Sequence, residues 1–190
     1  LLKGSAPVDA VTNSANSLAT FTEGANTPTI SKGTDGTIYL SSSDVSDSYI
    51  VECTTNCDLA ASWTETGTSP LDLAEDNNIL MPLSGGSVMI INRDISADLI
   101  RYRIWNGTNW GAGWTTIGSV ATENATYDIG MSVAVSPSTG DLYLAYISGY
   151  VALGADDQIR TARYTGGAWT TTKEALRYTE YGITSVALAL

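Results

Sequence analysis

The stretches DLAASW (residues 58–63), WNGTNW (105–110) and YTGGAW (164–169) decide the fold of this chain. Each ends in Trp, has a small residue three positions before that Trp, and begins with an acidic or aromatic residue. Each also follows segments in which apolar residues alternate with polar ones, the pattern of a half-buried β-strand. A pattern that recurs three times predicts a tandem array of one β unit.

The segments around these stretches align as a strand, a tight turn, a second strand, an Asp-bearing loop, a third strand and the turn leading to Trp. The second strands begin near Thr37, Ser87 and Asp141, so the unit repeats about every 50 residues. Gly-containing turns and strands of about five residues are hairpin signals, and no segment has helical periodicity. We expect four strands per unit and a helix content close to zero. The expected strands are 28–31, 37–40, 49–52 and one from 63 in the first copy, 79–82, 88–91, 100–104 and 114–120 in the second, and 131–135, 142–146 and 159–164 in the third.

A four-stranded unit of this length is typical of a propeller blade. The sequence therefore predicts an all-β fold, a partial β-propeller of three blades over residues 27–75, 76–125 and 126–175. Residues 1–26 are expected to end a preceding blade or form a linker, and residues 176–190 to supply the first strand of a further blade. Because propellers close with about four to eight blades, we expect the remaining blades in the same chain or in another chain.

Composition excludes several classes of function. The chain has 9 basic and 20 acidic residues, a formal charge of -11, which disfavours nucleic acid and anionic membrane surfaces as partners. It has no run of about 18 apolar residues, so we expect no membrane insertion. It contains no His, which removes Ser/His/Asp and Cys/His nucleophiles and His-ligated zinc.

The two cysteines, Cys53 and Cys57, are four positions apart in an expected hairpin turn. A turn can bring such neighbours to disulfide distance, and the acidic, Thr-rich composition agrees with an oxidising compartment. We therefore expect a disulfide and a secreted or cell-surface protein, with two free thiols as the alternative. Two cysteines without His cannot complete a tetrahedral metal shell.

The stretch NCDLAASW (56–63) resembles the Asp-box, Ser-x-Asp-x-Gly-x-x-Trp, of sialidase-like (BNR-repeat) propellers. Asp58 and Trp63 match the motif, Asn56 stands in the place of Ser and Ala60 in the place of Gly. The other two copies keep Gly and Trp but replace Asp by an aromatic residue. In that family the box is a structural turn remote from the active site, so the resemblance implies architecture and no activity.

A sialidase needs an Arg cluster, a Tyr nucleophile with a Glu partner, and an acid/base Asp. The stretch 102–104 (YRI) only echoes the family's Arg motif and lies on an expected third strand, where that motif does not occur. Arg101 and Arg103 are expected to lay their stems over apolar neighbours, with Arg160 in a matching place. Tyr178 and Glu180 are close in sequence but have no Arg cluster beside them. We predict no catalytic residues.

Three further sets of residues are candidate sites. Trp110 and Trp114 flank the insertion 111–113 and are candidates for stacking on sugar rings, with packing between blades as the alternative. Asp residues recur after each second strand and are weak calcium candidates, with turn formation as the alternative; those singled out are Asp44, Asp47, Asp94 and Asp98, and Asp156 and Asp157 follow the same pattern. Asn106 and Asn124 begin glycosylation sequons. No cofactor other than calcium is expected.

The sequence therefore predicts a non-catalytic extracellular propeller segment that serves adhesion, assembly or carbohydrate binding, with glycans or other surface proteins as partners. One alternative is part of a sialidase-like glycoside hydrolase whose catalytic residues lie mostly outside this chain. A second alternative is a structural subunit of a surface layer or filament.

Overall fold

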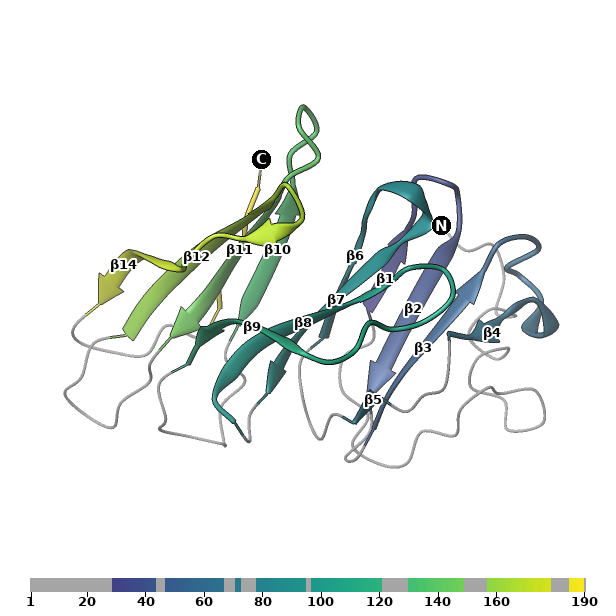
Figure 1. Cartoon of the computed structure of the whole chain (residues 1–190), viewed down its shortest axis with the longest axis horizontal. Helices are drawn as coiled ribbons and strands as arrows, with labels where there is room; N and C mark the ends of the chain where they lie inside the picture. Colours follow the sequence, from purple (N-terminus) through teal and green to yellow (C-terminus); the bar gives the residue numbers. More distant parts are fainter. Residues whose placement is uncertain are drawn as a thin grey trace. The chain divides into compact units, whose positions relative to one another are not determined.

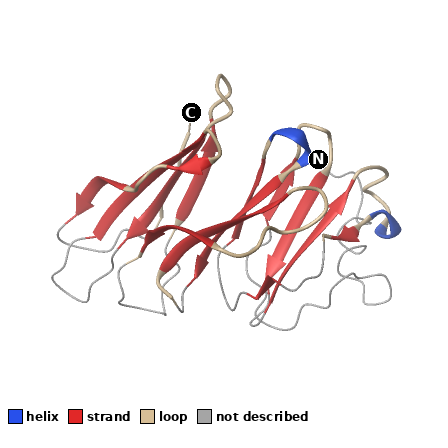
Figure 2. Cartoon of the chain, in the orientation of Figure 1, coloured by secondary structure: helices blue, strands red, loops and turns tan. Residues whose placement is uncertain are grey.

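The computed structural model describes residues 29–43, 47–66, 71–72, 78–94, 97–120, 130–148, 157–178 and 185–189. Within these ranges the regular structure is β-strand, interrupted by two single-turn 3-10 helices, η1 (Ala60–Ser62) and η2 (Ser84–Gly86) (Figure 2). The expectations of an all-β fold and of almost no helix are confirmed for this part of the chain. Neither of these helical turns is long and apolar enough to cross a membrane.

The first sheet, sheet 1, is antiparallel and follows chain order from β1 to β4. A further short strand, β5, also pairs with β3. Because β4 pairs with one end of β3 (Val51 and Glu52) and β5 with the other (Asp47 and Ser48), the two form a single fourth strand interrupted in its middle. The strands are β1 (Thr29–Lys32), β2 (Ile38–Ser43), β3 (Asp47–Cys53), β4 (Thr64–Glu65) and β5 (Leu71–Asp72).

Sheets 2 and 3 repeat this order (Figure 1). In sheet 3, β13 and β14 both pair with β12, so its fourth strand is also split, with a register shift at Ile159 and Arg160. Three antiparallel four-stranded sheets confirm the predicted repeat unit. The pieces β5 and β14 were not predicted, because β5 has only two residues and the six residues of β14 (KEALRY) do not alternate between polar and apolar. The strands are β6 (Asn78–Pro82), β7 (Val88–Asp94), β8 (Leu99–Trp105) and β9 (Thr115–Ser119) in sheet 2, and β10 (Met131–Val135), β11 (Leu142–Ser148), β12 (Asp157–Thr165), β13 (Ala168–Trp169) and β14 (Lys173–Tyr178) in sheet 3.

The first two strands of every sheet are joined by the same kind of turn. A backbone N–H at the start of the turn donates to a carbonyl oxygen at its end, at 2.7 Å in sheet 1 and 2.8 Å in sheets 2 and 3. The glycine before the second strand has a positive φ in each copy, 93° at Gly36, 73° at Gly86 and 74° at Gly140. Residues with a β-carbon rarely adopt this conformation, so the turn requires glycine there.

The described residues belong to two compact units, and the boundary between them passes through sheet 2. Unit 1 comprises residues 1–92 and 102–114, and unit 2 comprises residues 93–101 and 115–190. In unit 1, one face of sheet 1 packs against sheet 2, and the Tyr39 hydroxyl donates to the Gly86 carbonyl oxygen at 3.1 Å. Burying each large apolar side chain stabilises the fold by roughly 1.5–3 kcal/mol. The buried cluster comprises Tyr39, Ile50, Leu80, Val88, Ile90, Trp105 and Trp110.

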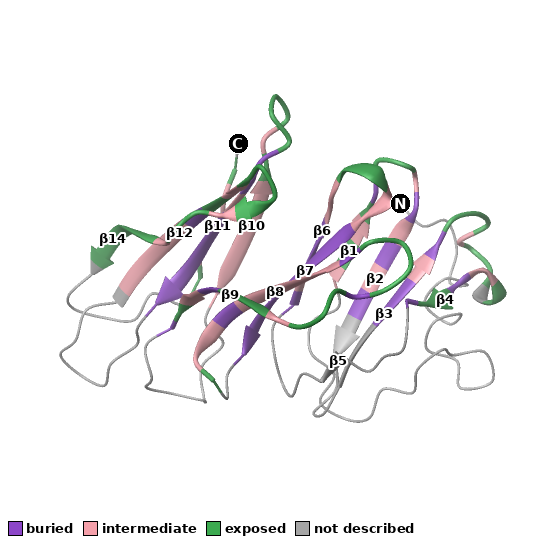
Figure 3. Ribbon diagram, in the orientation of Figure 1, coloured by how far each residue is buried: buried purple, intermediate pink, exposed green. Residues whose placement is uncertain are grey.

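The core of unit 2 centres on β11, which is buried along most of its length (Figure 3). Leu144 and Tyr146 are fully buried, and Ala145, which points to the opposite face of the strand, is only 2% exposed. A strand buried on both faces lies in the middle of the packed structure. Ser148 ties β11 to β9, because its hydroxyl donates to the Ser119 carbonyl oxygen at 3.4 Å.

The two ends of the chain differ in what the structure describes. Residues 185–189, where a first strand of a further blade is expected, have no regular secondary structure, but the Leu188 N–H donates to the Ser132 hydroxyl oxygen at 3.0 Å. The expected end of a preceding blade, residues 1–26, lies outside the described residues.

Candidate functional site

The recurring Trp stretch is the hairpin between the third and fourth strands. In sheet 2 it closes on Trp105 and Trp110, whose ring centres are 5.6 Å apart, and in sheet 3 on Tyr164 and Trp169, at 5.5 Å. Gly107, in the hairpin of sheet 2, has a φ of 88°. Cross-strand aromatic pairs of this kind stabilise a hairpin, so the motif in these two copies is a structural turn.

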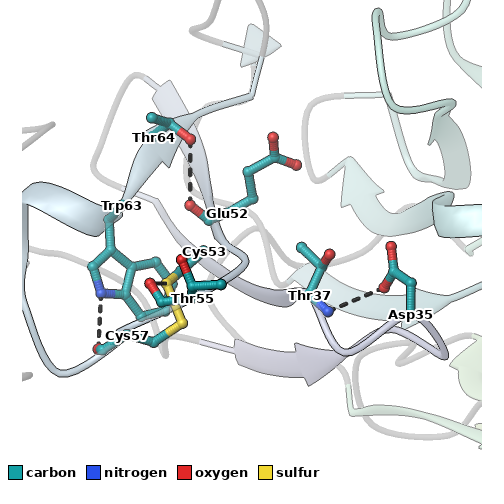
Figure 4. The surroundings of a disulfide bond; sticks show 8 residues. All are labelled: Asp35, Thr37, Glu52, Cys53, Thr55, Cys57, Trp63 and Thr64. Atoms are coloured by element: carbon teal, nitrogen blue, oxygen red, sulfur yellow. Dashed lines mark hydrogen bonds between the residues drawn. A yellow bond between two sulfur atoms is a disulfide. The ribbon is translucent and has the colours of Figure 1, made fainter.

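In sheet 1 the same position is occupied by the disulfide between Cys53 and Cys57 (Figure 4). Because Glu52 pairs with Thr64, the residue opposite Trp63 is Cys53 and not Asp58. The alignment of Asp58 with the first aromatic residue of the other stretches is therefore wrong in register: the loop of sheet 1 is longer. The expected disulfide is present.

The disulfide loop is packed against the core of sheet 1. The Trp63 indole Nε1 donates to the Cys57 carbonyl oxygen at 3.1 Å, and Cys53 is only 1% exposed. The Cys53 Sγ lies 3.4 Å from the Thr55 carbonyl oxygen; this is a van der Waals contact, because a disulfide sulfur has no proton to donate. The Asp58 side chain is exposed to solvent. The disulfide and Trp63 thus hold a loop that carries exposed side chains.

Of the two candidate stacking residues, Trp110 is buried. It is 9% exposed, and its Nε1 donates to the Thr66 carbonyl oxygen at 3.2 Å. This side chain packs between sheets 1 and 2, which is the alternative to sugar stacking that the sequence analysis gave, and it offers no ring face to a ligand. The physical reason is that the bridge to Trp105 turns Trp110 into the core.

Trp114 is partly exposed and packs against the same core cluster. The Arg103 guanidinium lies over its ring, 5.7 Å from the ring centre, and Arg103 Nη2 donates to the Gly111 carbonyl oxygen at 2.7 Å. Partial burial lowers the pKa of Arg103. Gly111 and Gly113 beside the pair are exposed. We call Arg103, Trp114 and residues 111–113 the Arg103–Trp114 surface; it presents a partly exposed guanidinium over a partly exposed indole ring.

Of the calcium candidates, Asp94 and Asp98 have described side chains; Asp94 ends β7, and Asp98 lies in the loop after it. Asp94 is 5% exposed, forms an ion pair with Arg101, and accepts a hydrogen bond from the Ala97 N–H at 3.0 Å. Asp98 adopts a φ of 56° in the same loop. Asp44 and Asp156, and the side chains of Asp47 and Asp157, lie outside the described residues. Within the described ranges, no group of three or more His, Cys, Asp or Glu side chains could hold a metal ion.

Asn106 is at the exposed tip of the sheet 2 hairpin. Its Oδ1 accepts hydrogen bonds from the Thr108 N–H at 3.0 Å and the Asn109 N–H at 2.9 Å, so it also forms the turn. The sequon residues are exposed. Asn124 lies outside the described residues.

The structure brings together one group of titratable side chains that the sequence analysis did not single out. Tyr39 and Glu52 are opposite each other on β2 and β3, and Asp35 is in the adjoining turn. Burial raises the pKa of Glu52, and Asp35 raises it further; the nearby Trp105 indole N–H lowers it in part, although its geometry falls short of a hydrogen bond. The register of the hairpin was the only signal that could have placed these residues together.

This group is poorly suited to the Tyr/Glu/Asp chemistry of a sialidase. Burial, Glu52 and Asp35 all raise the pKa of Tyr39, the opposite of what a phenolate nucleophile needs. Tyr39 is also only 2% exposed, and its hydroxyl donates a hydrogen bond to the Gly86 carbonyl oxygen.

Arg101 and Arg160, whose stems were expected to lie over apolar neighbours, make polar contacts with side chains of the same sheet. Arg101 pairs with Asp94, and Arg160 donates from Nε and Nη2 to the Gln158 Oε1 at 3.3 and 3.2 Å. The side chain of Tyr178 and the whole of Glu180 lie outside the described residues.

Comparison with known proteins found no family model that matches this chain and no match among curated proteins.

Proposed function

We propose that the three sheets are consecutive blades of a β-propeller that acts outside the cell as a non-catalytic module for adhesion, assembly or carbohydrate contact. The observation that carries this proposal is the threefold repetition of one antiparallel four-stranded sheet with the same kind of first turn. Repeated four-stranded sheets of this length are typical of propellers. The Arg103–Trp114 surface is the part of the described chain that suits such a contact.

Two observations favour contact with a ligand over catalysis. The titratable group at Tyr39 is engaged within the core, whereas the Arg103–Trp114 surface is partly exposed. Its guanidinium can donate to carboxylate or hydroxyl oxygens, and the partly exposed indole ring of Trp114 supplies an apolar contact of the kind that sugars accept. The disulfide supports an oxidising compartment.

The test is a glycan array probed with the wild-type chain and with two matched variants. Trp114→Ala should abolish binding to any glycan that the wild type retains, and Arg103→Met should weaken binding to acidic glycans most. Trp169→Ala is the control, because Trp169 pairs with Tyr164 in sheet 3 and is not part of this surface. The same loss of binding in all three variants, or no glycan retained by the wild type, contradicts the carbohydrate part of the proposal.

The structural alternative, a subunit of a surface layer or filament, is favoured by a different observation. Ile30 is 60% exposed on the edge strand β1, although the residue in the same place of sheet 2, Leu80, is 3% exposed. Negative-stain microscopy of the concentrated protein would show ordered arrays if the chain assembles in this way, and dispersed particles if it does not.

A further inference from the structure

The tip of the sheet 2 hairpin is an exposed turn between two buried Trp side chains. Trp105 and Trp110 are 4% and 9% exposed, and their ring centres are 5.6 Å apart. Residues 106–109 between them are all exposed. The turn is closed by a bond from the Asn106 N–H to the Asn109 carbonyl oxygen at 3.3 Å. The two Trp side chains hold the hairpin in the core of unit 1, so a bulky group attached at the tip would not disturb the packing.

The side chain of Asn106 uses only one of its two polar atoms. Its Oδ1 accepts hydrogen bonds from the Thr108 N–H at 3.0 Å and the Asn109 N–H at 2.9 Å. Among the described residues, none accepts a hydrogen bond from the Asn106 Nδ2, and none bonds the Thr108 hydroxyl. The exposed tip therefore carries an amide nitrogen and, two residues later, a hydroxyl that the fold does not use.

The first turn of sheet 1 shows that this kind of turn does not need an amide nitrogen. Residues 35–37 (DGT) differ from residues 106–108 (NGT) only in the first position. The Asp35 Oδ1 accepts a hydrogen bond from the Thr37 N–H at 3.0 Å, the same bond that Asn106 makes. The glycines also agree, since φ is 93° at position 36 and 88° at position 107. A carboxylate thus serves the turn as well as a carboxamide, and the Asn106 Nδ2 is free for another role.

The residues at the tip have the chemistry of a glycan acceptor. Asn-x-Thr, with x other than Pro, is the acceptor sequence for N-linked glycosylation. The Asn nitrogen is the atom that is glycosylated, and the Thr hydroxyl completes the sequence that the transferase reads. Asn109 is in the same exposed turn, but the residue two positions after it is Gly111, so it is not an acceptor.

We propose that the chain carries an N-linked glycan on the Asn106 Nδ2. The donor is an oligosaccharide joined through pyrophosphate to a polyprenyl lipid. In the transfer, the bond between Nδ2 and C1 of the first sugar forms, and the bond between C1 and the pyrophosphate oxygen breaks. A base of the transferase takes one Nδ2 proton, and the lipid pyrophosphate leaves. The product keeps the Asn106 Oδ1, so both hydrogen bonds of the turn are retained after glycosylation.

The inference rests on the extracellular part of the proposed function, because secreted chains are the ones that meet this donor. The Cys53–Cys57 disulfide agrees with such a compartment. The inference goes beyond the proposed function by adding a covalent sugar. It does not depend on ligand binding at the Arg103–Trp114 surface, so the glycan array can fail while this proposal stands.

The experiment directs the 190-residue chain into the secretory pathway of a eukaryotic cell with a cleavable signal peptide and analyses the secreted protein. Trypsin alone leaves both sequons in one peptide, residues 104–160. A further cut after Glu123 gives residues 104–123, the Asn106 peptide, and residues 124–160, which contain Asn124. Mass spectrometry before and after treatment with peptide-N-glycosidase then reports each site separately. We expect a glycan on most copies of the Asn106 peptide.

Four variants separate the acceptor role of the tip from its role in the turn. Asn106→Asp keeps the Oδ1 that the turn needs and removes the amide nitrogen, so the chain should be secreted without this glycan. Thr108→Ala should also lose the glycan, and Thr108→Ser should retain it, because the hydroxyl is kept. Asn109→Gln is the matched control, since it changes an exposed Asn of the same tip, and it should leave the glycan in place.

Two results overturn the proposal. One is an unmodified Asn106 peptide from a secreted chain in which the Cys53–Cys57 disulfide has formed, and this result leaves the extracellular function standing. The other is a glycan that persists on this peptide in Asn106→Asp.

Discussion

Replacing Gly118 by Ala should destabilise unit 2 because there is no room for a β-carbon. Gly118 lies on β9. A methyl group there would be 2.3 Å from the Tyr146 hydroxyl oxygen and 2.8 Å from the Thr172 Cγ2. Carbon atoms in contact prefer separations of about 3.5–4.0 Å, so both neighbours would have to move.

The magnitude follows from how firmly Tyr146 is held. Its side chain is fully buried on the central strand β11, so its ring cannot swing into solvent. Burial also raises the pKa of Tyr146, which agrees with a hydroxyl enclosed by protein. Overpacking a core of this kind costs about 1–3 kcal/mol, and with two clashing atoms we expect about 2 kcal/mol. For a chain of this length that lowers Tm by about 4–8 °C.

The assay is thermal and urea unfolding of three variants followed by near-UV circular dichroism. Gly113→Ala is the control, because a β-carbon there meets nothing within 4 Å; it should be neutral or slightly stabilising. Tyr146→Phe combined with Gly118→Ala should recover part of the loss, since the 2.3 Å contact disappears while the ring carbon at 3.3 Å remains. The packing argument is refuted if Gly118→Ala is as stable as Gly113→Ala. It is also refuted if the double variant is no more stable than Gly118→Ala alone.

Three further outcomes are expected. Hydrogen bonds from Arg163 and Thr139 hold the pKa of Asp141 at about 2, below its usual 3.8. The ionised Asp141 carboxylate therefore stabilises the folded chain fully above pH 3.8, and this stabilisation is lost as the pH falls towards 2. In a plot of urea midpoint against pH, Asp141→Asn should flatten the curve over that range. Replacing Cys53 and Cys57 together by Ala should lower the free energy of unfolding by about 2 kcal/mol, the value for so short a loop, and an unchanged urea midpoint would contradict it. Trp110→Phe should lower the free energy of unfolding by about 2 kcal/mol, because core contacts and the hydrogen bond to the Thr66 carbonyl oxygen are lost. A decrease below about 0.5 kcal/mol in urea unfolding would show that Trp110 is not a core residue.

The strands and first turns were predictable because both depend on neighbouring residues. Residues 131–135 alternate over the whole length of β10, and the observed strand has those bounds. Gly36 and Gly86 mark turns that need a positive φ, a local backbone requirement. The fourth strands of sheets 1 and 3 were harder to predict, because each is split into two pieces, whereas the unbroken β9 (Thr115–Ser119) lies within the predicted range 114–120.

The register after the third strand could not be read from spacing. Asp58 has the same distance to Trp63 as Tyr164 has to Trp169, yet pairing places Cys53 opposite Trp63. A loop can gain residues without changing the strands on either side of it, so equal spacing in the sequence does not guarantee equal positions in the sheet.

The sequence by itself determined an all-β chain and its threefold repeat and favoured the Cys53–Cys57 disulfide, because alternation, turn glycines and short loops act over a few residues. Only the tertiary structure decided that Trp110 is buried, that Trp114 lies under Arg103, and that Ile30 stays open while Leu80 is covered. The burial of Trp110 depends on which sheet faces meet, because its indole N–H donates to Thr66, 44 positions earlier in the chain, and no local pattern encodes such a contact.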